Sequence, residues 1–135
     1  MASPIRILYL DDSDIDHRLM AAYLESDPRR SYDVTPCRTL EEALGAMQCG
    51  GYDALIIDNR MPPYTSYHEP YRKLKSSTGY HGPTLVVTAD VTARELDQDF
   101  RQDHEIVLDK ANLLSAIRAG MLATLGNETA ICRPH

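Results

Sequence analysis

Two apolar runs in this chain of 135 residues each stop at aspartate. The run over residues 5–10 leads directly into Asp11 and Asp12, and the run over residues 52–57 leads into Asp58. Adjacent carboxylates repel each other, and a bound cation is the simplest way to offset both the repulsion and the loss of hydration. Alternatively, Asp11 and Asp12 only begin a polar loop that caps the following helix. The repetition of the pattern at Asp58 favours one shared acidic site.

The whole chain alternates between strand-like apolar runs and helix-like segments. Near-continuous apolar strands are typical of a parallel sheet that is covered by helices on both faces. The alternation predicts an α/β fold, a doubly wound sheet of five parallel strands with five helices and right-handed crossovers. The predicted strands are residues 5–10, 32–37, 52–58, 84–88 and 105–108, and the predicted helices begin near Asp14, Leu40, Tyr67, Thr92 and Leu113.

Helical periodicity also predicts buried faces and helix ends. In the first helix, the apolar spacing predicts a buried face made of Ile15, Leu19, Ala22 and Tyr23. Before the second helix, Thr39 and Glu42 have the spacing of a capping box. The last helix is expected to extend to Leu125.

Size and composition limit the possible partners. The length predicts one domain over residues 1–125, followed by a flexible tail over residues 126–135. The formal net charge of −6 argues against nucleic acid as a direct partner, and no apolar run is long enough to cross a membrane. Three cysteines without CxxC spacing indicate reduced thiols, and with no N-terminal signal pattern we expect a cytoplasmic location.

The carboxyl ends of the predicted strands form a candidate site. Open parallel sheets bind ligands beyond these ends, where the sequence places Asp11, Asp12, Asp58, Thr88 and Lys110. Carboxylate oxygens suit Mg²⁺, and an aspartate is also a nucleophile toward phosphorus. An ammonium and a hydroxyl stabilise charge on phosphoryl oxygens. This set predicts a site that holds a divalent cation and a phosphoryl group together.

The order of these residues resembles a known family. With Met61 and Pro62 behind Asp58, and Ala89 behind Thr88, the chain resembles a response-regulator receiver domain of two-component signalling over about residues 4–125. The resemblance implies the flavodoxin-like receiver topology. It also implies a phosphoacceptor domain that catalyses only its own phosphorylation and dephosphorylation.

The resemblance further implies a role for each residue of the site. Asp58 would be the phosphoacceptor, Thr88 the switch hydroxyl and Lys110 the lysine that pairs with the phosphoryl group. The implied ligands of Mg²⁺ are Asp12 and Asp58 directly, Asp11 through water, and the backbone carbonyl of Arg60.

Three departures from the family concern the output of such a domain. Ala111 follows Lys110 where receivers usually have proline, and Val107 stands where they usually have tyrosine or phenylalanine. A glycine that commonly follows the Met-Pro pair is missing from residues 63–68. The aromatic rotamer switch of the family therefore cannot operate from Val107.

The implied function is that of a stand-alone, single-domain regulator, either monomeric or weakly dimeric. Asp58 would receive its phosphoryl group from a histidine kinase or a histidine phosphotransfer protein. The domain would then signal to an unidentified downstream protein, or act as a phosphate sink or relay. Two alternatives are a pseudo-receiver that regulates without phosphorylation and a small phosphohydrolase. The second lacks a general acid two residues after Asp58, because that residue is Arg60.

Two further groups of residues each allow two interpretations. One group forms either a partner-binding aromatic patch or the cover of a loosely packed helix, and it consists of Tyr64, Tyr67, Tyr71 and Tyr80 with His68 and His81. His17 is expected to be a solvated residue of the first helical turn rather than a ligand or a pH-sensitive neighbour of the acidic loop.

Overall fold

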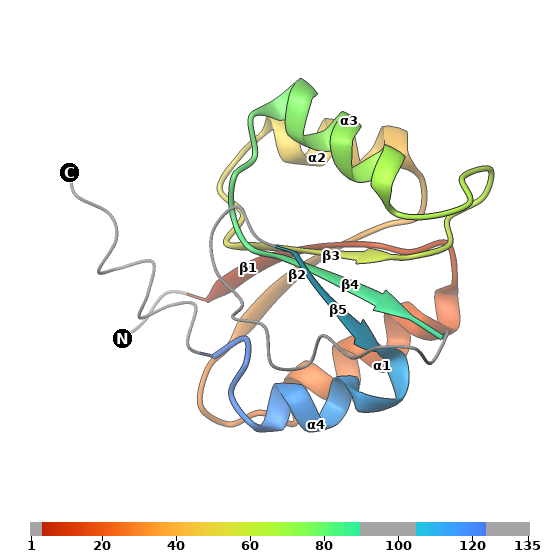
Figure 1. Ribbon diagram of the computed structural model, residues 1–135. Coiled ribbons are helices and arrows are strands. Elements are labelled where there is room, and N and C mark those ends of the chain that lie inside the picture. The colour runs from red at the N-terminus through yellow and green to blue at the C-terminus, as the bar shows by residue number, and fades with distance from the viewer. Residues whose placement is uncertain (1–3, 90–104, 124–135) are drawn as a thin grey trace.

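The computed structural model describes residues 4–89 and 105–123, which form a parallel sheet between two pairs of helices (Figure 1). Its elements are β1 (Ile5–Leu10), α1 (Asp14–Glu25), β2 (Tyr32–Cys37), α2 (Leu40–Gln48), β3 (Ala54–Asp58), α3 (His68–Thr78), β4 (Thr84–Thr88), β5 (Glu105–Asp109), the 3-10 turn η1 (Lys110–Asn112) and α4 (Leu113–Arg118). All neighbouring strands are parallel, in the order β2-β1-β3-β4-β5. The predicted fold class is confirmed.

Four of the five predicted helices fall within this part of the chain. The predicted helix at residues 92–101 and the predicted tail at residues 126–135 lie outside the described residues. Among residues 4–89 and 105–123, no helix has the length and apolar character needed to span a bilayer.

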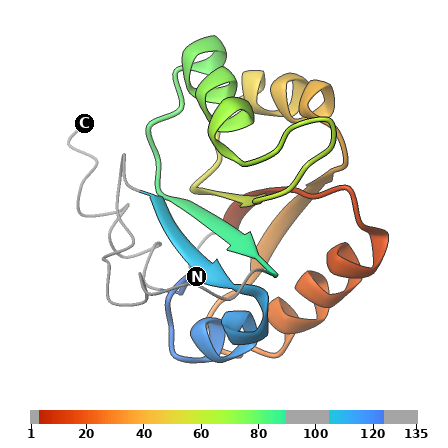
Figure 2. The same ribbon diagram turned by 45° about the vertical axis from the view of Figure 1, so that its right-hand side comes forward.

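Alternate residues of each strand face the two helix layers. In β1, Ile7 and Tyr9 pack in one core cluster with residues of α1 and α4, whereas Leu8 and Leu10 pack in another with residues of α2 and α3. The two pairs of helices cover opposite faces of the sheet, as the turned view in Figure 2 also shows. Every residue of β3 and β4 is buried, as expected for central strands covered on both faces.

Side-chain caps fix the beginnings of two helices. Ser13 caps α1 by accepting a hydrogen bond from the N–H of Asp16 at 3.2 Å. Thr39 caps α2 by accepting from the N–H of Glu42 at 3.2 Å, as its spacing predicted. The carboxylate of Glu42 reaches back to the N–H of Arg38, the residue before the cap, at 2.7 Å. Both caps satisfy N–H groups that have no partner within the helix.

Of the four residues predicted to form the buried face of α1, Tyr23 packs against the core, whereas Ile15, Leu19 and Ala22 are exposed. Ile15 is 68% exposed and Leu19 is 43% exposed, and the buried residues of this helix are Met20 and Leu24. The side of α1 that faces the protein begins with polar side chains, which belong to the candidate site described below. The spacing of apolar residues alone therefore indicated the wrong phase for the helix.

The last helix, α4, ends at Arg118, before the predicted end at Leu125, which lies outside the described residues. Gly120 has a φ of 101°, a left-handed conformation that stops a helix. The guanidinium of Arg29 donates to the carbonyl of Ile117 at 3.2 Å and to that of Arg118 at 2.5 Å. These bonds satisfy carbonyl groups that the end of a helix leaves without partners.

Strand β2 forms one edge of the sheet, beside β1. It contains Pro36, which pairs in register with Tyr9, and its Asp33 is exposed. Proline has no N–H, and in sheets it is confined to edges, first residues and bulges. Its place in β2 agrees with that rule.

Candidate functional site

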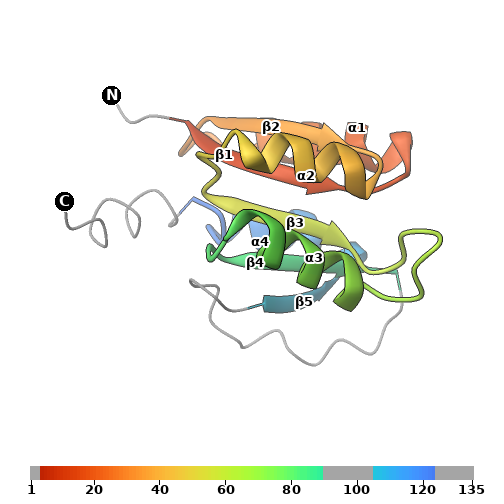
Figure 3. The ribbon, with the colours of Figure 1, turned by 90° about the horizontal axis from the view of Figure 1, so that it is seen from above.

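The carboxyl ends of the strands lie at one edge of the sheet, since the strand arrows in Figure 3 point the same way. At this edge, β1 is followed by Asp11 and Asp12, and β3 ends at Asp58. The strand β4 ends at Thr88, and β5 is followed by Lys110. The fold thus brings all five predicted residues to the same edge.

Three carboxylates gather at this edge. Asp11, Asp12 and Asp58 each offer one oxygen atom within 4.8 Å of the others, with Asp11 and Asp58 buried and Asp12 exposed. The loop that they begin does cap the following helix, through Ser13, but the three carboxylates also come together, which favours one shared acidic site. Carboxylate oxygens are the ligands that hard divalent cations prefer. The donor set and its spacing therefore fit such a cation.

The two buried carboxylates carry an unfavourable concentration of charge. The pKa of Asp58 is raised to about 6, because burial and the charge of Asp11, which raise it, outweigh Lys110 and the backbone N–H of Arg60, which lower it. Burial also raises the pKa of Asp11. A cation at this position would relieve the repulsion, because it favours the charged form of each carboxylate.

The ammonium group of Lys110 lies among three carboxylates. Its Nζ atom is 3.3 Å from Oδ1 of Asp58, 3.5 Å from Oδ2 of Asp11 and 2.6 Å from Oδ2 of Asp16. Burial alone would lower the pKa of Lys110, but the hydrogen bond with Asp16 and the charges of Asp11 and Asp58 raise it above its ordinary value. Lys110 therefore stays charged.

Asp16 is a residue of this site that the sequence analysis missed. The sequence carries one signal for it, since aspartates alternate at Asp12, Asp14 and Asp16. Which of them faces the site depends on the phase of α1. That phase was predicted from Ile15 and Leu19, and the prediction was wrong.

Tyr9 and His17 also contact the acidic cluster. The Tyr9 hydroxyl donates to Oδ2 of Asp11 at 2.5 Å, and the N–H of Ser13 donates to Oδ1 at 3.0 Å. Nε2 of His17 lies 2.7 Å from the carbonyl oxygen of Asp11. A carbonyl only accepts, so Nε2 is the nitrogen that carries the proton. The imidazole also packs edge-on against the Tyr9 ring, with centroids 4.7 Å apart, so the expectation of a solvated His17 is wrong.

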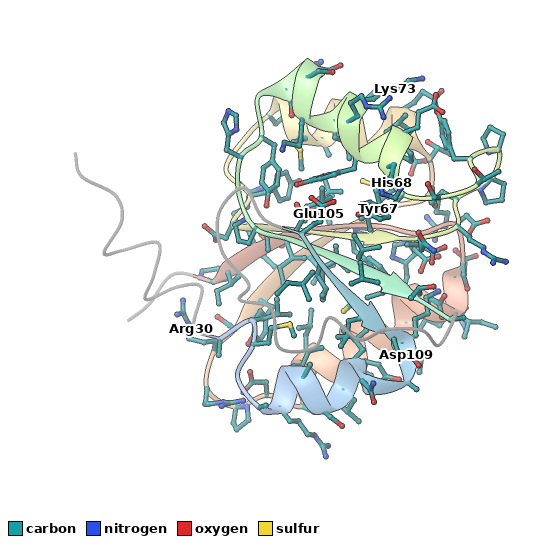
Figure 4. All side chains as sticks on the ribbon, in the orientation of Figure 1. Arg30, Tyr67, His68, Lys73, Glu105 and Asp109 are labelled. Atoms are coloured by element: carbon teal, nitrogen blue, oxygen red, sulfur yellow. The ribbon has the colours of Figure 1, made fainter. Side chains whose placement is uncertain are left out.

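The segment around Lys110 shows how the departures from the family pattern are accommodated. Thr88 is buried and pairs in register with Asp109, which is labelled beside α4 in Figure 4. The Asp109 carboxylate accepts a hydrogen bond from the N–H of Ala111 at 3.0 Å, a bond that proline could not donate. Val107 is partly buried against the α2 and α3 side of the core. An aliphatic side chain thus fills the position of the family's aromatic residue.

The tyrosines near α3 are largely packed. Tyr67 and Tyr71 are each 7% exposed, and the Tyr67 hydroxyl donates to Glu105 of β5 at 2.6 Å. Figure 4 shows Tyr67 and Glu105 close together between α3 and the sheet. The exposed His68 stacks on Tyr67, with ring centroids 4.1 Å apart. These contacts favour the interpretation of the tyrosines as a cover for α3 over that of an exposed binding patch.

A scan against protein-family models found no match to this chain, and a search of curated proteins found none either. Solved structures, in contrast, match it over most of its length. The receiver domain of a sensor histidine kinase from Pseudomonas aeruginosa, with a magnesium ion coordinated in its active-site cleft, has a TM-score of 0.68 at 18% identity, over 92% of this chain and 99% of that chain.

Two response regulators give similar matches. One from Thermotoga maritima, in complex with Mg²⁺ and BeF, has a TM-score of 0.61 at 23% identity, over 87% of this chain and 97% of that chain. One from Burkholderia pseudomallei, with a phosphorylated aspartic acid, a calcium ion and citrate, has a TM-score of 0.62 at 18% identity, over 93% of this chain and 71% of that chain. The present chain has the fold of the response-regulator receiver domains.

Proposed function

We propose that this chain is a receiver domain that accepts a phosphoryl group on Asp58 from a histidine kinase or a histidine phosphotransfer protein. One observation carries the proposal. Asp11, Asp12 and Asp58 offer oxygen atoms within 4.8 Å of one another, and the Lys110 ammonium lies 3.3 Å from Asp58. The magnesium, BeF and phosphorylated aspartate held by proteins of the same fold support it.

In this proposal Asp58 is the nucleophile. One of its carboxylate oxygens forms a bond to phosphorus while the bond between phosphorus and the donor's imidazole nitrogen breaks, and the electron pair of that bond stays on the nitrogen. Lys110 and the Thr88 hydroxyl then pair with phosphoryl oxygens. The step needs charge stabilisation and alignment and little proton transfer.

The proposed ligands of Mg²⁺ are Asp12 and Asp58 directly, Asp11 through water, and the backbone carbonyl of Arg60. The bound ion supplies positive charge that offsets the charge of the phosphoryl oxygens. We further propose that the phosphorylated domain acts through contact with a downstream protein or as a phosphate sink. Val107 offers no aromatic ring for the switch, so Thr88 is the proposed link between the phosphoryl group and that response.

A pseudo-receiver, which regulates without phosphorylation, is the second candidate. One observation favours it, because the carboxylate closest to Lys110 is that of Asp16 and not that of Asp58. The complete set of carboxylates at the strand ends favours phosphorylation.

Amide NMR of the full chain with Mg²⁺ and beryllofluoride separates the two candidates. Beryllofluoride is a stable analogue of the phosphoryl group, so a receiver should show shifted amides around both Asp58 and Thr88. The matched control is Asp58→Asn, which should keep a dispersed spectrum and lose the response. A wild-type protein whose amides do not respond would contradict phosphorylation and favour the pseudo-receiver.

A further inference from the structure

We propose that Asp16 is a positioning residue that holds the Lys110 ammonium in competition with the phosphoryl group on Asp58. The inference rests on the proposed function of Asp58 and adds a residue that the strand-end pattern does not contain. Nζ of Lys110 lies 2.6 Å from Asp16, compared with 3.3 Å from Asp58 and 3.5 Å from Asp11.

The contact between Asp16 and Lys110 is partly shielded from water. The side chains of Lys110 and Asp16 are 26% and 24% exposed, so their attraction is screened less than that of a pair on the open surface. The contact also joins α1 to η1, the turn that follows β5. Ser13 fixes the backbone of Asp16 by accepting its N–H at the helix cap.

Asp16 and a phosphoryl group on Asp58 compete for the same few N–H donors of Lys110. An ammonium has three N–H donors, and in this structure three carboxylates surround it. A phosphoryl group on Asp58 brings additional anionic oxygens that need the same ammonium. Lys110 must then turn from Asp16 toward these oxygens, or divide its donors between them.

The negative charge of Asp16 also disfavours a phosphoryl group on Asp58. A carboxylate near the site repels an anionic group on Asp58, in addition to attracting its counterion. Both effects disfavour the phosphoryl-bearing state. Asp16 thus sets how strongly the site holds such a group, through Lys110 and through its own charge, without contacting the reacting atoms.

Asp14 provides a matched control on the same helix. It lies in the first turn of α1, as Asp16 does, but its side chain is 64% exposed and pairs with Arg38. Replacing Asp14 by asparagine removes the same charge from the same helical turn and leaves Lys110 untouched.

The test is a titration of the full chain with beryllofluoride at saturating Mg²⁺, followed by fluorine NMR, in the wild type, Asp16→Asn, Asp16→Glu and Asp14→Asn. We expect Asp16→Asn to bind beryllofluoride about fivefold more tightly than the wild type. Asp16→Glu retains the carboxylate, and Asp14→Asn leaves the pair intact, so both should stay within about twofold of the wild type. Equal or weaker binding by Asp16→Asn would overturn the inference, whereas a wild type that does not bind would overturn the proposed function.

NMR of the Lys110 ammonium tests the same contact in the wild type alone, whatever the stability of the variants. Without ligand, the hydrogen bond to Asp16 should protect the ammonium protons from exchange with water. Beryllofluoride should shift the ammonium resonance as Nζ turns from Asp16. A bound wild type with an unchanged ammonium resonance would contradict the competition.

Discussion

The hydroxyl of Tyr9 donates a hydrogen bond to Oδ2 of Asp11 at 2.5 Å. The two residues are two positions apart at the end of β1, so their side chains leave the strand on the same face. Burial raises the pKa of Tyr9 strongly, and the bond to Asp11 raises it too, so the hydroxyl keeps its proton and acts as the donor. The hydrogen bond from Tyr9 therefore stabilises the Asp11 carboxylate, a proposed ligand of Mg²⁺, when no metal is bound.

We expect Tyr9→Phe to lower the metal-free stability and to tighten magnesium binding. The Asp11 carboxylate loses a buried donor, which should reduce the free energy of unfolding by about 1–3 kcal/mol. Without this donor, Oδ2 of Asp11 is free to interact more strongly with the ion. Urea unfolding with a chelator measures the first effect and calorimetric titration with Mg²⁺ measures the second.

Tyr32→Phe is the control for this prediction. The Tyr32 hydroxyl donates to the buried Asp27 at 2.6 Å, a similar pair away from the site. This variant should lose stability without any change in magnesium affinity. Unchanged magnesium affinity in both variants would show that the Tyr9 hydroxyl does not compete with the metal.

The metal-free protein should become less stable as the pH rises from about 4 to about 6. The pKa of Asp58 is raised by burial to about 6 in the folded protein, so over this range the folded state binds more protons than the unfolded state. Its free energy of unfolding therefore falls with rising pH. Asp58→Asn should be more stable than the wild type above pH 6 by about 1–3 kcal/mol and should show a flatter pH dependence. The measurement is the urea midpoint of both proteins across this pH range, with chelator present. Midpoints that change with pH in the same way in the wild type and in Asp58→Asn would contradict the prediction.

Magnesium should stabilise the wild type and should fail to stabilise Asp12→Asn. An ion that binds only the folded state contributes about 2.7 kcal/mol at a concentration 100 times its dissociation constant. Asp12 is exposed, so its replacement should change the metal-free stability by less than about 0.5 kcal/mol. Asp33→Asn removes the same charge from an exposed position on β2 and should keep the full response. Thermal melts with and without Mg²⁺ distinguish the variants, and a full magnesium response in Asp12→Asn would exclude Asp12 as a ligand.

Arg29→Ala should destabilise the fold without affecting the site. Its guanidinium bonds the buried Asp27 at 2.9 Å and the carbonyl groups at the end of α4. Because the arginine side chain is 47% exposed, we expect a loss of about 1–3 kcal/mol rather than the larger cost of opening a fully buried pair. Arg29→Lys should recover part of it, since an ammonium cannot reach all these acceptors with the geometry of a guanidinium. Denaturant unfolding at neutral pH gives the stability of both variants. If Arg29→Ala were as stable as the wild type, Arg29 would not stabilise the fold.

The sequence allowed the acidic edge of the sheet to be predicted, because Asp11 and Asp58 directly follow apolar strands. Parallel strands bring such ends together whatever the loops do. The contact between Asp16 and Lys110 could not be predicted in the same way. It depends on the phase of α1, and the exposed Ile15 gave the wrong phase.

The bond from Tyr9 to Asp11 lay within reach of the sequence, since alternate residues of a strand share a face. Tyr9 stands in the apolar run over residues 5–10, and its ring is part of the core. The apolar pattern takes no account of its hydroxyl, which a buried tyrosine usually pairs with a polar group. A partner two residues away was the nearest acceptor to consider.

Pro36 and Asp33 in β2 have a consequence for how the molecule meets other proteins. An open strand edge normally invites another chain to extend the sheet, and this can lead to aggregation. On the β2 side, a residue without an N–H interrupts the row of donors and an exposed carboxylate adds charge. Strand addition is therefore disfavoured along this edge, and partners that approach this side must be recognised through helices and loops.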